Sequence, residues 1–291
     1  LLLTKDFAGT VTTPAKRFDI SVIMDCETNQ PSLRCWAGTT FDDVVSYAVR
    51  HGYHGLENLS LIPGECGASA VQNIGAYGAE VKDVISEIEA VEISSGRVVK
   101  FKGSDCGYSY RQSAFKHEWK NQYLITYVTY QLSRTFKPQL DYGNIRSQLE
   151  QRGITEAQLT ADQLRDVIID IRQSKLPDPV VMGNAGSFFM NPIVDADTFA
   201  TLKAAHPNLR YFEVTGDDGK VGYKIPAGWM IDQCGWKGRS LGRAGVYDKQ
   251  ALILVNRGGA TGQEVVDLMH AVQHDVKKEF GLDLKPEVNI I

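Results

Sequence analysis

Apolar and polar residues in the N-terminal half of the chain follow mainly the short period of β-strands, and one segment follows the period of a helix. Phe41, Val44, Val45, Ala48 and Val49 form one apolar face, which predicts a helix over 41–50 that ends before a glycine. We expect strands at Leu1–Leu3, Gly9–Thr12, Arg17–Met24, Ser32–Cys35 and Tyr123–Leu132, and a hairpin of Glu87–Ile93 with Arg97–Phe101 around Ser95-Gly96.

The C-terminal half carries stronger helix signals. Thr160 with Gln163, and Thr261 with Glu264, have the spacing of capping boxes, and they predict helices over 160–175 and 261–280. A further helix is expected over 196–205 and a strand over 251–256. Residues 134–159 are polar and irregular, which indicates a connection or flap. Helices and strands are mixed without a regular βαβ alternation, so the fold class is predicted to be α+β.

A proline-rich break, Leu176-Pro177-Asp178-Pro179, follows the helix over 160–175 and is the predicted domain boundary. With the irregular segment before it, this break gives three parts. They are a first domain over 1–133, a flap and connecting helix over 134–176, and a C-terminal domain over 177–291. The chain opens on apolar leucines without an initiator methionine, so we expect further residues upstream of this sequence.

Composition and charge exclude several classes of protein. With 31 basic and 35 acidic residues the net charge is −4, which gives no electrostatic case for binding nucleic acid or an anionic membrane. No apolar run approaches the length of a membrane span. The five cysteines are scattered without a C-x-x-C motif, which argues against a disulfide framework or a zinc site and suits a reducing compartment.

Two glycine-rich stretches carry candidate chemistry. Residues 59–78 combine glycines with small residues, and exposed amides in such a segment can cradle a phosphate or a polar ring edge. The segment is neither a P-loop nor a dinucleotide fingerprint, and a set of tight turns remains an alternative. Residues 183–192 place Ser187 between small residues and two phenylalanines, which predicts a rigid turn that presents the serine. A buried turn with a satisfied hydroxyl is the alternative.

Two charged residues have similarly open interpretations. Arg111 stands among tyrosines and can hold an anion or stack on a ring, although an exposed loop arginine is the more usual case. Glu287 follows a proline between apolar residues near the terminus, where an exposed charge in a strand is equally possible.

Taken together, the motifs of this chain resemble those of the UDP-N-acetylenolpyruvoylglucosamine reductase (MurB) family, and of its type I members in particular. They stand in family order and cover nearly the whole chain: Ile62-Pro63-Gly64, Gln72-Asn73-Ile74-Gly75-Ala76-Tyr77-Gly78, Tyr110-Arg111-Gln112-Ser113, Lys175-Leu176-Pro177-Asp178-Pro179, Gly183 to Pro192, Ala227-Gly228-Trp229-Met230-Ile231-Asp232-Gln233 and Pro286-Glu287-Val288.

The resemblance implies an FAD-binding domain of the vanillyl-alcohol-oxidase type and a C-terminal substrate domain. It implies FAD as cofactor, NADPH as hydride source, and the small molecule UDP-N-acetylglucosamine enolpyruvate as substrate, reduced to UDP-N-acetylmuramate for peptidoglycan synthesis. It also implies a bacterial cytoplasmic protein with roles in cell shape and division. We expect a monomer with no nucleic-acid, membrane or metal partner.

The implied chemistry adds a hydride from flavin N5 to C3 and a proton to C2. By resemblance Ser187 donates the proton, and Arg111 and Glu287 flank the substrate carboxylate, where Glu287 would have to be protonated or act through water. The flavin would face the segment from Pro63 to Ile74, with cofactor contacts at Pro63, Gly64, Gly67, Ser69, Gln72, Asn73 and Ile74. The sugar nucleotide would be held at Tyr77, Tyr142, Lys175, Asn191, Lys237 and Gln250, where the lysines suit a diphosphate.

Three departures from the family pattern stand out. The glycine-rich flavin-phosphate segment expected before Leu1 is not in this sequence, Met190 stands where many members have lysine, and Ala68 and Ala70 replace polar residues or proline. Two other functions remain open: another FAD-dependent oxidoreductase of the same superfamily, or a non-catalytic module that binds flavin or a nucleotide sugar. The first lacks a matching histidine or cysteine motif for covalent flavin, and the second would not need a proton donor.

Overall fold

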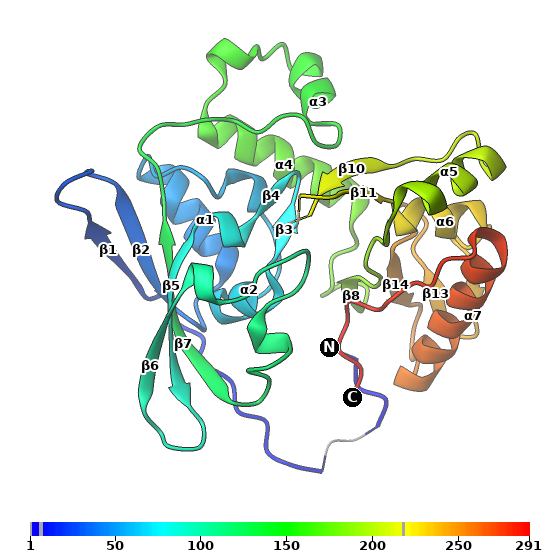
Figure 1. Cartoon of the computed structure of the whole chain (residues 1–291), viewed down its shortest axis with the longest axis horizontal. Coiled ribbons are helices and arrows are strands. Elements are labelled where there is room, and N and C mark those ends of the chain that lie inside the picture. Colours follow the sequence, from blue (N-terminus) through cyan, green and yellow to red (C-terminus); the bar gives the residue numbers. More distant parts are fainter. Residues whose placement is uncertain (1, 6–7, 217–218) are drawn as a thin grey trace. The chain divides into compact units, whose positions relative to one another are not determined.

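The computed structural model describes residues 2–5, 8–216 and 219–291. Contacts divide the chain into two compact units, Thr10–Arg172 and Leu1–Gly9 with Gln173–Ile291 (Figure 1). Helices and antiparallel sheets are mixed in both units, as predicted. The predicted three-part division at residues 133 and 176 stays a prediction.

The unit Thr10–Arg172 is built on a five-stranded antiparallel sheet with the strand order β1-β2-β7-β5-β6. Its strands are β1 (Ile20–Met24), β2 (Pro31–Trp36), β5 (Ile85–Glu92), β6 (Val98–Lys102) and β7 (Tyr123–Gln131). Alternate residues of β2, such as Leu33 and Cys35, are buried because a strand sends successive side chains to opposite faces. The hairpin β5–β6 confirms the predicted one, and Gly96 in its turn has the left-handed φ of 72°.

Two helices complete the main core of this unit. Helix α1 (Phe41–Arg50) has the predicted bounds, and its apolar face is buried with the residues of α2 (Cys66–Gln72) and of the sheet. A small hairpin, β3 (Gly75–Ala76) with β4 (Ala79–Glu80), follows α2. Short 3₁₀ helices lie at Glu57–Leu59, Val81–Asp83, Gly103–Asp105, Ala114–Lys116 and Glu156–Gln158.

The segment predicted as an irregular flap contains a helix, α3 (Ile145–Gln151), which precedes α4 (Ala161–Lys175). Their apolar residues form a separate small core that includes Ile145, Leu149 and Leu164. The polar character of α3 hid it, because only Ile145 and Leu149 of its seven residues are buried. The capping box of α4 is confirmed. The backbone N–H of Gln163 donates to Thr160 Oγ1 at 3.2 Å, and the backbone N–H of Thr160 donates to Gln163 Oε1 at 3.0 Å.

The described residues of the other unit form two antiparallel sheets and the helices α5, α6 and α7. Strands β12 (Ser240–Leu241), β13 (Ala244–Val246), β14 (Ile253–Asn256) and β8 (Asn184–Ser187) form one sheet in that order, and β10 (Phe212–Thr215), β11 (Val221–Lys224) and β9 (Ile193–Val194) form the other. Helix α5 (Ala196–Ala205) has the predicted bounds, and α6 (Ala227–Gln233) coincides with a stretch that the sequence analysis identified only as a motif.

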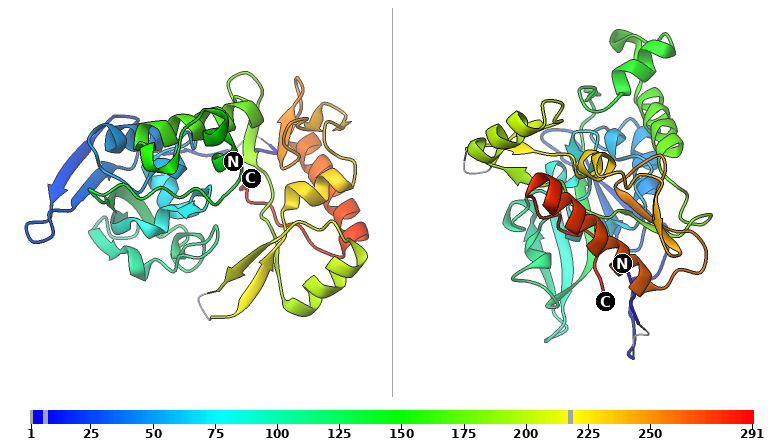
Figure 2. Two further views of the ribbon diagram at one scale, coloured as in Figure 1. Left: turned by 90° about the horizontal axis from the view of Figure 1, so that it is seen from above. Right: turned by 90° about the vertical axis from the view of Figure 1, so that its right-hand side faces the viewer.

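Helix α7 (Gly262–Phe280) covers the sheet of β12, β13 and β14 (Figure 1, Figure 2). Its capping box is confirmed, with Thr261 and Glu264 bonded to each other's amides, and Gly281 ends it with a left-handed φ of 68°. The buried face of α7 packs into the core that also holds Phe188 and Phe189.

Two strand predictions near the start of the chain need correction. Residues 9–12 form no strand, because they have no ladder partner and are exposed, so local sequence could not supply the pairing. Leu2 pairs only as an isolated bridge with Ile290, where the Leu2 amide donates to the Asn289 carbonyl at 2.8 Å, and Leu1 lies outside the described residues.

Candidate active site

Ser187 is the last residue of strand β8, where the sequence predicted a tight turn. It pairs with Ile253 of β14, and the ladder shifts register between Ile253 and Val255. Gly186 takes up a φ of 74°, which a non-glycine residue rarely adopts. The predicted turn is therefore an irregular strand end, and the tertiary pairing with β14 causes the difference. The Ser187 side chain is exposed.

The two phenylalanines after the serine anchor this strand end in the core. Phe188 and Phe189 are both 1% exposed, and their rings meet edge to face at 5.3 Å. The Phe188 amide donates to the Leu252 carbonyl at 2.8 Å. Ser187 therefore presents an exposed side chain, and its backbone is held in place by the two buried phenylalanines that follow it. The sequence predicted this rigid presentation of the serine.

The C-terminal segment pairs with the residues that follow Ser187. The Met190 amide donates to the Lys285 carbonyl at 2.9 Å, and the Glu287 amide donates to the Phe188 carbonyl at 2.8 Å. An antiparallel bridge joins Phe189 and Pro286 between them. Two residues predicted to act together, Ser187 and Glu287, are therefore brought together within one unit by backbone hydrogen bonds across a hundred residues of sequence.

Three predicted substrate-binding residues lie around helix α6. The Asn191 Oδ1 accepts a hydrogen bond from the Ala227 amide at 2.8 Å and so caps the start of α6. A Cβ on Gly228 would lie 3.0 Å from Gln250 Oε1, and Lys237 Nζ lies 3.7 Å from Asp232 Oδ2. Lys175 is exposed at the end of α4, away from this helix in sequence.

The predicted flavin segment begins with an open loop. Pro63 and Gly64 are exposed, and Gly64 has a φ of 114° with no atom within 4 Å of the place where a Cβ would stand. Its carbonyl accepts the Phe41 amide at 3.0 Å, which ties the loop to the start of α1. Gly67 packs against Ala37, with 3.0 Å between the Ala37 Cβ and a Cβ built on the glycine.

The remaining predicted cofactor residues differ in what they offer. Ser69 is 1% exposed, and its hydroxyl donates to the Cys66 carbonyl at 2.7 Å and lies 2.8 Å from the Tyr130 hydroxyl, so it is committed to the core. Gln72 Oε1 accepts from Lys116 Nζ at 3.2 Å. Ile74 is half-buried at the start of the β3–β4 hairpin.

Asn73 and Arg111 are joined in one polar network. The Arg111 guanidinium donates to the carbonyls of Asn73 at 3.2 Å and of Gly75 at 2.5 Å, and Nη1 lies 3.8 Å from Glu80 Oε1. The Asn73 amide group donates to Glu80 Oε2 at 3.2 Å and to the Ser109 carbonyl at 2.8 Å. Arg111 is therefore no exposed loop arginine, because its side chain is only 15% exposed and is held at a fixed position.

Tyr77 and Tyr142 lie beside each other. A Cβ on Gly143 would stand 3.6 Å from the Tyr77 ring, and a Cβ on Gly78 would stand 3.4 Å from the Tyr142 Cβ. Burial raises the pKa of Tyr77, although Arg172 opposes it through its charge and a hydrogen bond to the phenol. Burial also raises the pKa of Tyr142, and the positive charge of Arg111 opposes this shift. Arg111 and the two tyrosines thus share one neighbourhood.

Backbone strain is concentrated in these segments. Leu61, Asn73, Tyr77 and Arg111 all have left-handed φ values, between 44° and 58°, that non-glycine residues seldom adopt. The carbonyl of each accepts a side-chain donor: Arg172 for Leu61, Arg111 for Asn73, Asn58 for Tyr77 and Lys116 for Arg111.

Three of these donors, Arg172, Asn58 and Lys116, were not among the residues singled out from the sequence. Asn58 is 5% exposed, and its side-chain Nδ2 donates to the carbonyls of Tyr77 and Gln139 at 2.8 and 2.9 Å. A lone asparagine or lysine carries no sequence signal for such a role. For Arg172 one signal was available, because it stands seven residues after Arg165 on a predicted helix and therefore on the same side of it.

The residues of the loop fit a bound FAD. The amides of Gly64 and Glu65 donate no hydrogen bond within the part of the chain that the structure describes, and they stand in an open, glycine-containing loop. Such amides can meet the polar edge of a planar ring or an anionic group. The fixed loop and the strained positions beside it are typical of a ligand site.

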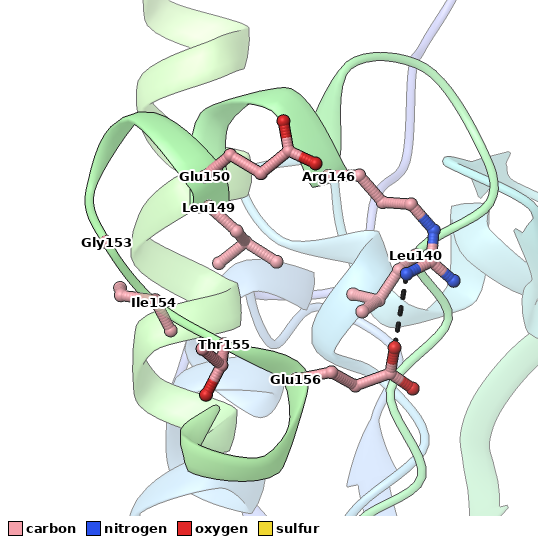
Figure 3. Close-up of a pocket in the computed structure, with 8 residues that line it drawn as sticks. All are labelled: Leu140, Arg146, Leu149, Glu150, Gly153, Ile154, Thr155 and Glu156. Atoms are coloured by element: carbon pink, nitrogen blue, oxygen red, sulfur yellow. Dashed lines mark hydrogen bonds and ion pairs between the residues drawn. The ribbon is translucent and has the colours of Figure 1, made fainter.

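A hollow of about 390 Å³ in the flap region contains none of the predicted site residues (Figure 3). It is lined by Leu140, Arg146, Leu149, Glu150, Gly153, Ile154, Thr155 and Glu156. Arg146 is already paired there with Glu156 at 3.1 Å. Among residues 2–5, 8–216 and 219–291, no cluster of acidic, histidine and cysteine side chains is arranged for a metal ion, and none of the helices has the length and apolar character of a membrane span.

Residues 178–291 match the family model described as the C-terminal domain of UDP-N-acetylenolpyruvoylglucosamine reductase, and residues 16–102 match an FAD binding domain. The UDP-N-acetylenolpyruvoylglucosamine reductase of Bacteroides fragilis is 51% identical over 291 residues, which cover 100% of this chain and 84% of that protein. The enzyme of the same name from Burkholderia ambifaria is 47% identical over 250 residues, covering 86% of this chain and 70% of that one.

The crystal structure of UDP-N-acetylenolpyruvylglucosamine reductase (MurB) from Thermus caldophilus superposes with a TM-score of 0.58 at 22% identity, over 87% of this chain and 70% of that one. This likeness supports the fold. Together with the matched domains, it confirms the predicted α+β class with an FAD-binding domain joined to a C-terminal domain. The chain therefore belongs to the UDP-N-acetylenolpyruvoylglucosamine reductase family, the FAD-binding oxidoreductases of peptidoglycan synthesis.

Proposed function

We propose that this chain reduces UDP-N-acetylglucosamine enolpyruvate to UDP-N-acetylmuramate with NADPH, and that Ser187, Glu287 and Arg111 carry the chemistry. FAD, when bound, supplies the hydride. The observation that supports the assignment most directly is the backbone pairing of Phe188–Met190 with Lys285–Glu287, which brings Glu287 to the serine strand.

Ser187 donates the proton that C2 of the enolpyruvyl group needs after a hydride has added at C3. A hydroxyl is a weak acid in water, so its usefulness depends on a fixed position and on a dry, relayed environment. The buried phenylalanines that follow Ser187 hold its backbone, and the exposed side chain is accessible to a substrate.

Arg111 and Glu287 act at the substrate carboxylate. Hydride addition places negative charge on the enolpyruvyl carboxylate, and a fixed positive charge stabilises that charge without reorganisation. The two carbonyl hydrogen bonds of Arg111 hold its guanidinium in place before substrate binds. Glu287 helps an anion only as the protonated acid or through a water molecule.

The sugar nucleotide is held by the residues around α6 and by the tyrosine pair. Asn191, Gln250 and Lys237 offer amide groups and a positive charge that suit a uridine diphosphate. Tyr77 and Tyr142 offer ring faces and hydroxyls, and Lys175 a further cation. We propose a cytoplasmic monomer, in keeping with a small soluble substrate.

An anaerobic absorbance experiment tests the proposal. The purified protein, reconstituted with FAD, is mixed with NADPH and then with the enolpyruvyl sugar nucleotide. We expect the visible flavin band to bleach and then to return on addition of the sugar nucleotide. Recovery only with oxygen would favour an oxidase instead, and a protein that binds flavin and sugar nucleotide without either change would be a binding module.

A further inference from the structure

Leu61 has a backbone conformation that its sequence does not explain. Its φ is 57°, in the left-handed region that a residue with a Cβ avoids. Leu61 stands directly before Ile62-Pro63-Gly64, the open loop at the start of the proposed flavin segment. Because a change of φ at one residue swings the chain that follows it, the conformation of Leu61 sets the path of this loop.

The amide of Leu61 is fixed by an ion pair. It donates to Asp42 Oδ1 at 2.5 Å, and the same carboxylate receives Arg165 Nη1 at 2.7 Å and Nη2 at 2.8 Å. The Asp42 side chain is 23% exposed and the Arg165 side chain 13%, so solvent screens their attraction less than that of a surface ion pair. A two-pronged arginine–carboxylate pair also fixes the direction of the carboxylate, and with it the direction of the Leu61 amide.

The carbonyl of Leu61 is fixed by the same helix. It accepts Arg172 Nε at 3.2 Å, and Arg172 stands seven residues after Arg165 on α4, so both arginines project from one side of the helix. The Arg172 guanidinium also lies close enough to the phenol of Tyr77, a proposed substrate residue, for its charge to act on that side chain. Both peptide groups of a single strained residue are thus held by α4 and by the first turn of α1.

We propose that Asp42, Arg165 and Arg172 form a clamp, the Leu61 clamp, that holds Leu61 left-handed and thereby positions the Pro63–Gly64 backbone for FAD. The three are positioning residues. The inference rests on the flavin segment of the proposed function. Without the clamp, Leu61 relaxes to an ordinary conformation, and FAD has to restore the loop at the expense of its own affinity.

The test measures FAD binding to the full-length apo-protein by the change in flavin fluorescence. Arg165→Met keeps the aliphatic stem of the side chain and removes the ion pair. We expect its Kd for FAD to rise roughly ten-fold, the factor that matches the ordinary preference against a left-handed non-glycine residue. Arg152→Met is the matched control. It removes another arginine ion pair to helix α4, that of Arg152 with Asp170, which does not contact Leu61. The Kd of this variant for FAD should equal that of the wild type.

A second variant separates positioning from general destabilisation. Leu61→Gly removes the conformational penalty, so Arg165→Met combined with Leu61→Gly should bind FAD within about two- to three-fold of the wild type. Circular dichroism of each variant confirms folding. If Arg165→Met binds FAD like the wild type, or if glycine at position 61 gives no rescue, the clamp is refuted. If the wild-type protein itself takes up no FAD, the proposed flavin function fails, and this role of the clamp fails with it.

Discussion

Replacing Ser187 by alanine should separate stability from catalysis in this protein. The side chain is exposed at the end of β8, and no hydrogen bond to its hydroxyl occurs among the described residues. The backbone pairing with Ile253 and the burial of Phe188 do not involve the hydroxyl. We therefore expect the free energy of unfolding to change by no more than about 0.5 kcal/mol.

The rate should respond very differently. A positioned proton donor typically contributes a factor of about 10² to 10⁴, which corresponds to roughly 2.7 to 5.5 kcal/mol of activation free energy. Stopped-flow absorbance under anaerobic conditions distinguishes the two half-reactions. Flavin reduction by NADPH should keep its wild-type rate in Ser187→Ala, and reoxidation by the enolpyruvyl sugar nucleotide should slow by that factor.

Ser240→Ala is the matched control, since Ser240 is another exposed strand serine of the same unit and lies outside the proposed site. Both of its half-reactions should match the wild type. A Ser187→Ala protein that is reoxidised at the wild-type rate would refute the proton-donor role. A large loss of stability would show instead that the hydroxyl has a structural partner.

Three further predictions concern stability, each measured by urea unfolding. Gly186→Ala should cost about 1 kcal/mol, because φ is 74° and the space around the new Cβ is open, so that only backbone strain acts. Ser69→Ala should cost about 1–3 kcal/mol by leaving the buried Tyr130 hydroxyl without its closest partner, and Tyr130→Phe in the same protein should recover part of this loss. Burial raises the pKa of Asp42, but the hydrogen bonds and charges of the Leu61 clamp outweigh burial and lower it. Its stabilising contribution should therefore be complete above the ordinary carboxyl value near 3.9, be lost as the pH falls through the lowered folded pKa, and be absent from Asp42→Asn.

Local signals in the sequence predicted those elements whose stabilising contacts lie close together in the chain. The bounds of α1 followed from one apolar face. Both capping boxes are present, because the groups that satisfy each other stand three residues apart. The turn at Gly96 followed from its own residues.

Elements that depend on distant partners were predicted less well. Strand β8 was taken for a turn because its ladder partner, β14, lies some 70 residues later in the chain. The strand predicted over residues 9–12 has no ladder partner among the described residues, so its alternating pattern produced no strand. Helix α3 is stabilised by burial against α4, which its polar sequence does not reveal.

The sequence by itself determined the family and the presence of an FAD-binding and a C-terminal domain, and it named the candidate site residues, because the motifs stand in family order along the chain. Only the tertiary structure decided which of those residues are held, and by what. It brought Glu287 to Ser187 through backbone pairing, committed the Ser69 hydroxyl to the core, and placed Leu61 between Asp42 and Arg172. The physical reason is that hydrogen bonds between distant segments depend on position in space, and a linear pattern encodes only neighbours.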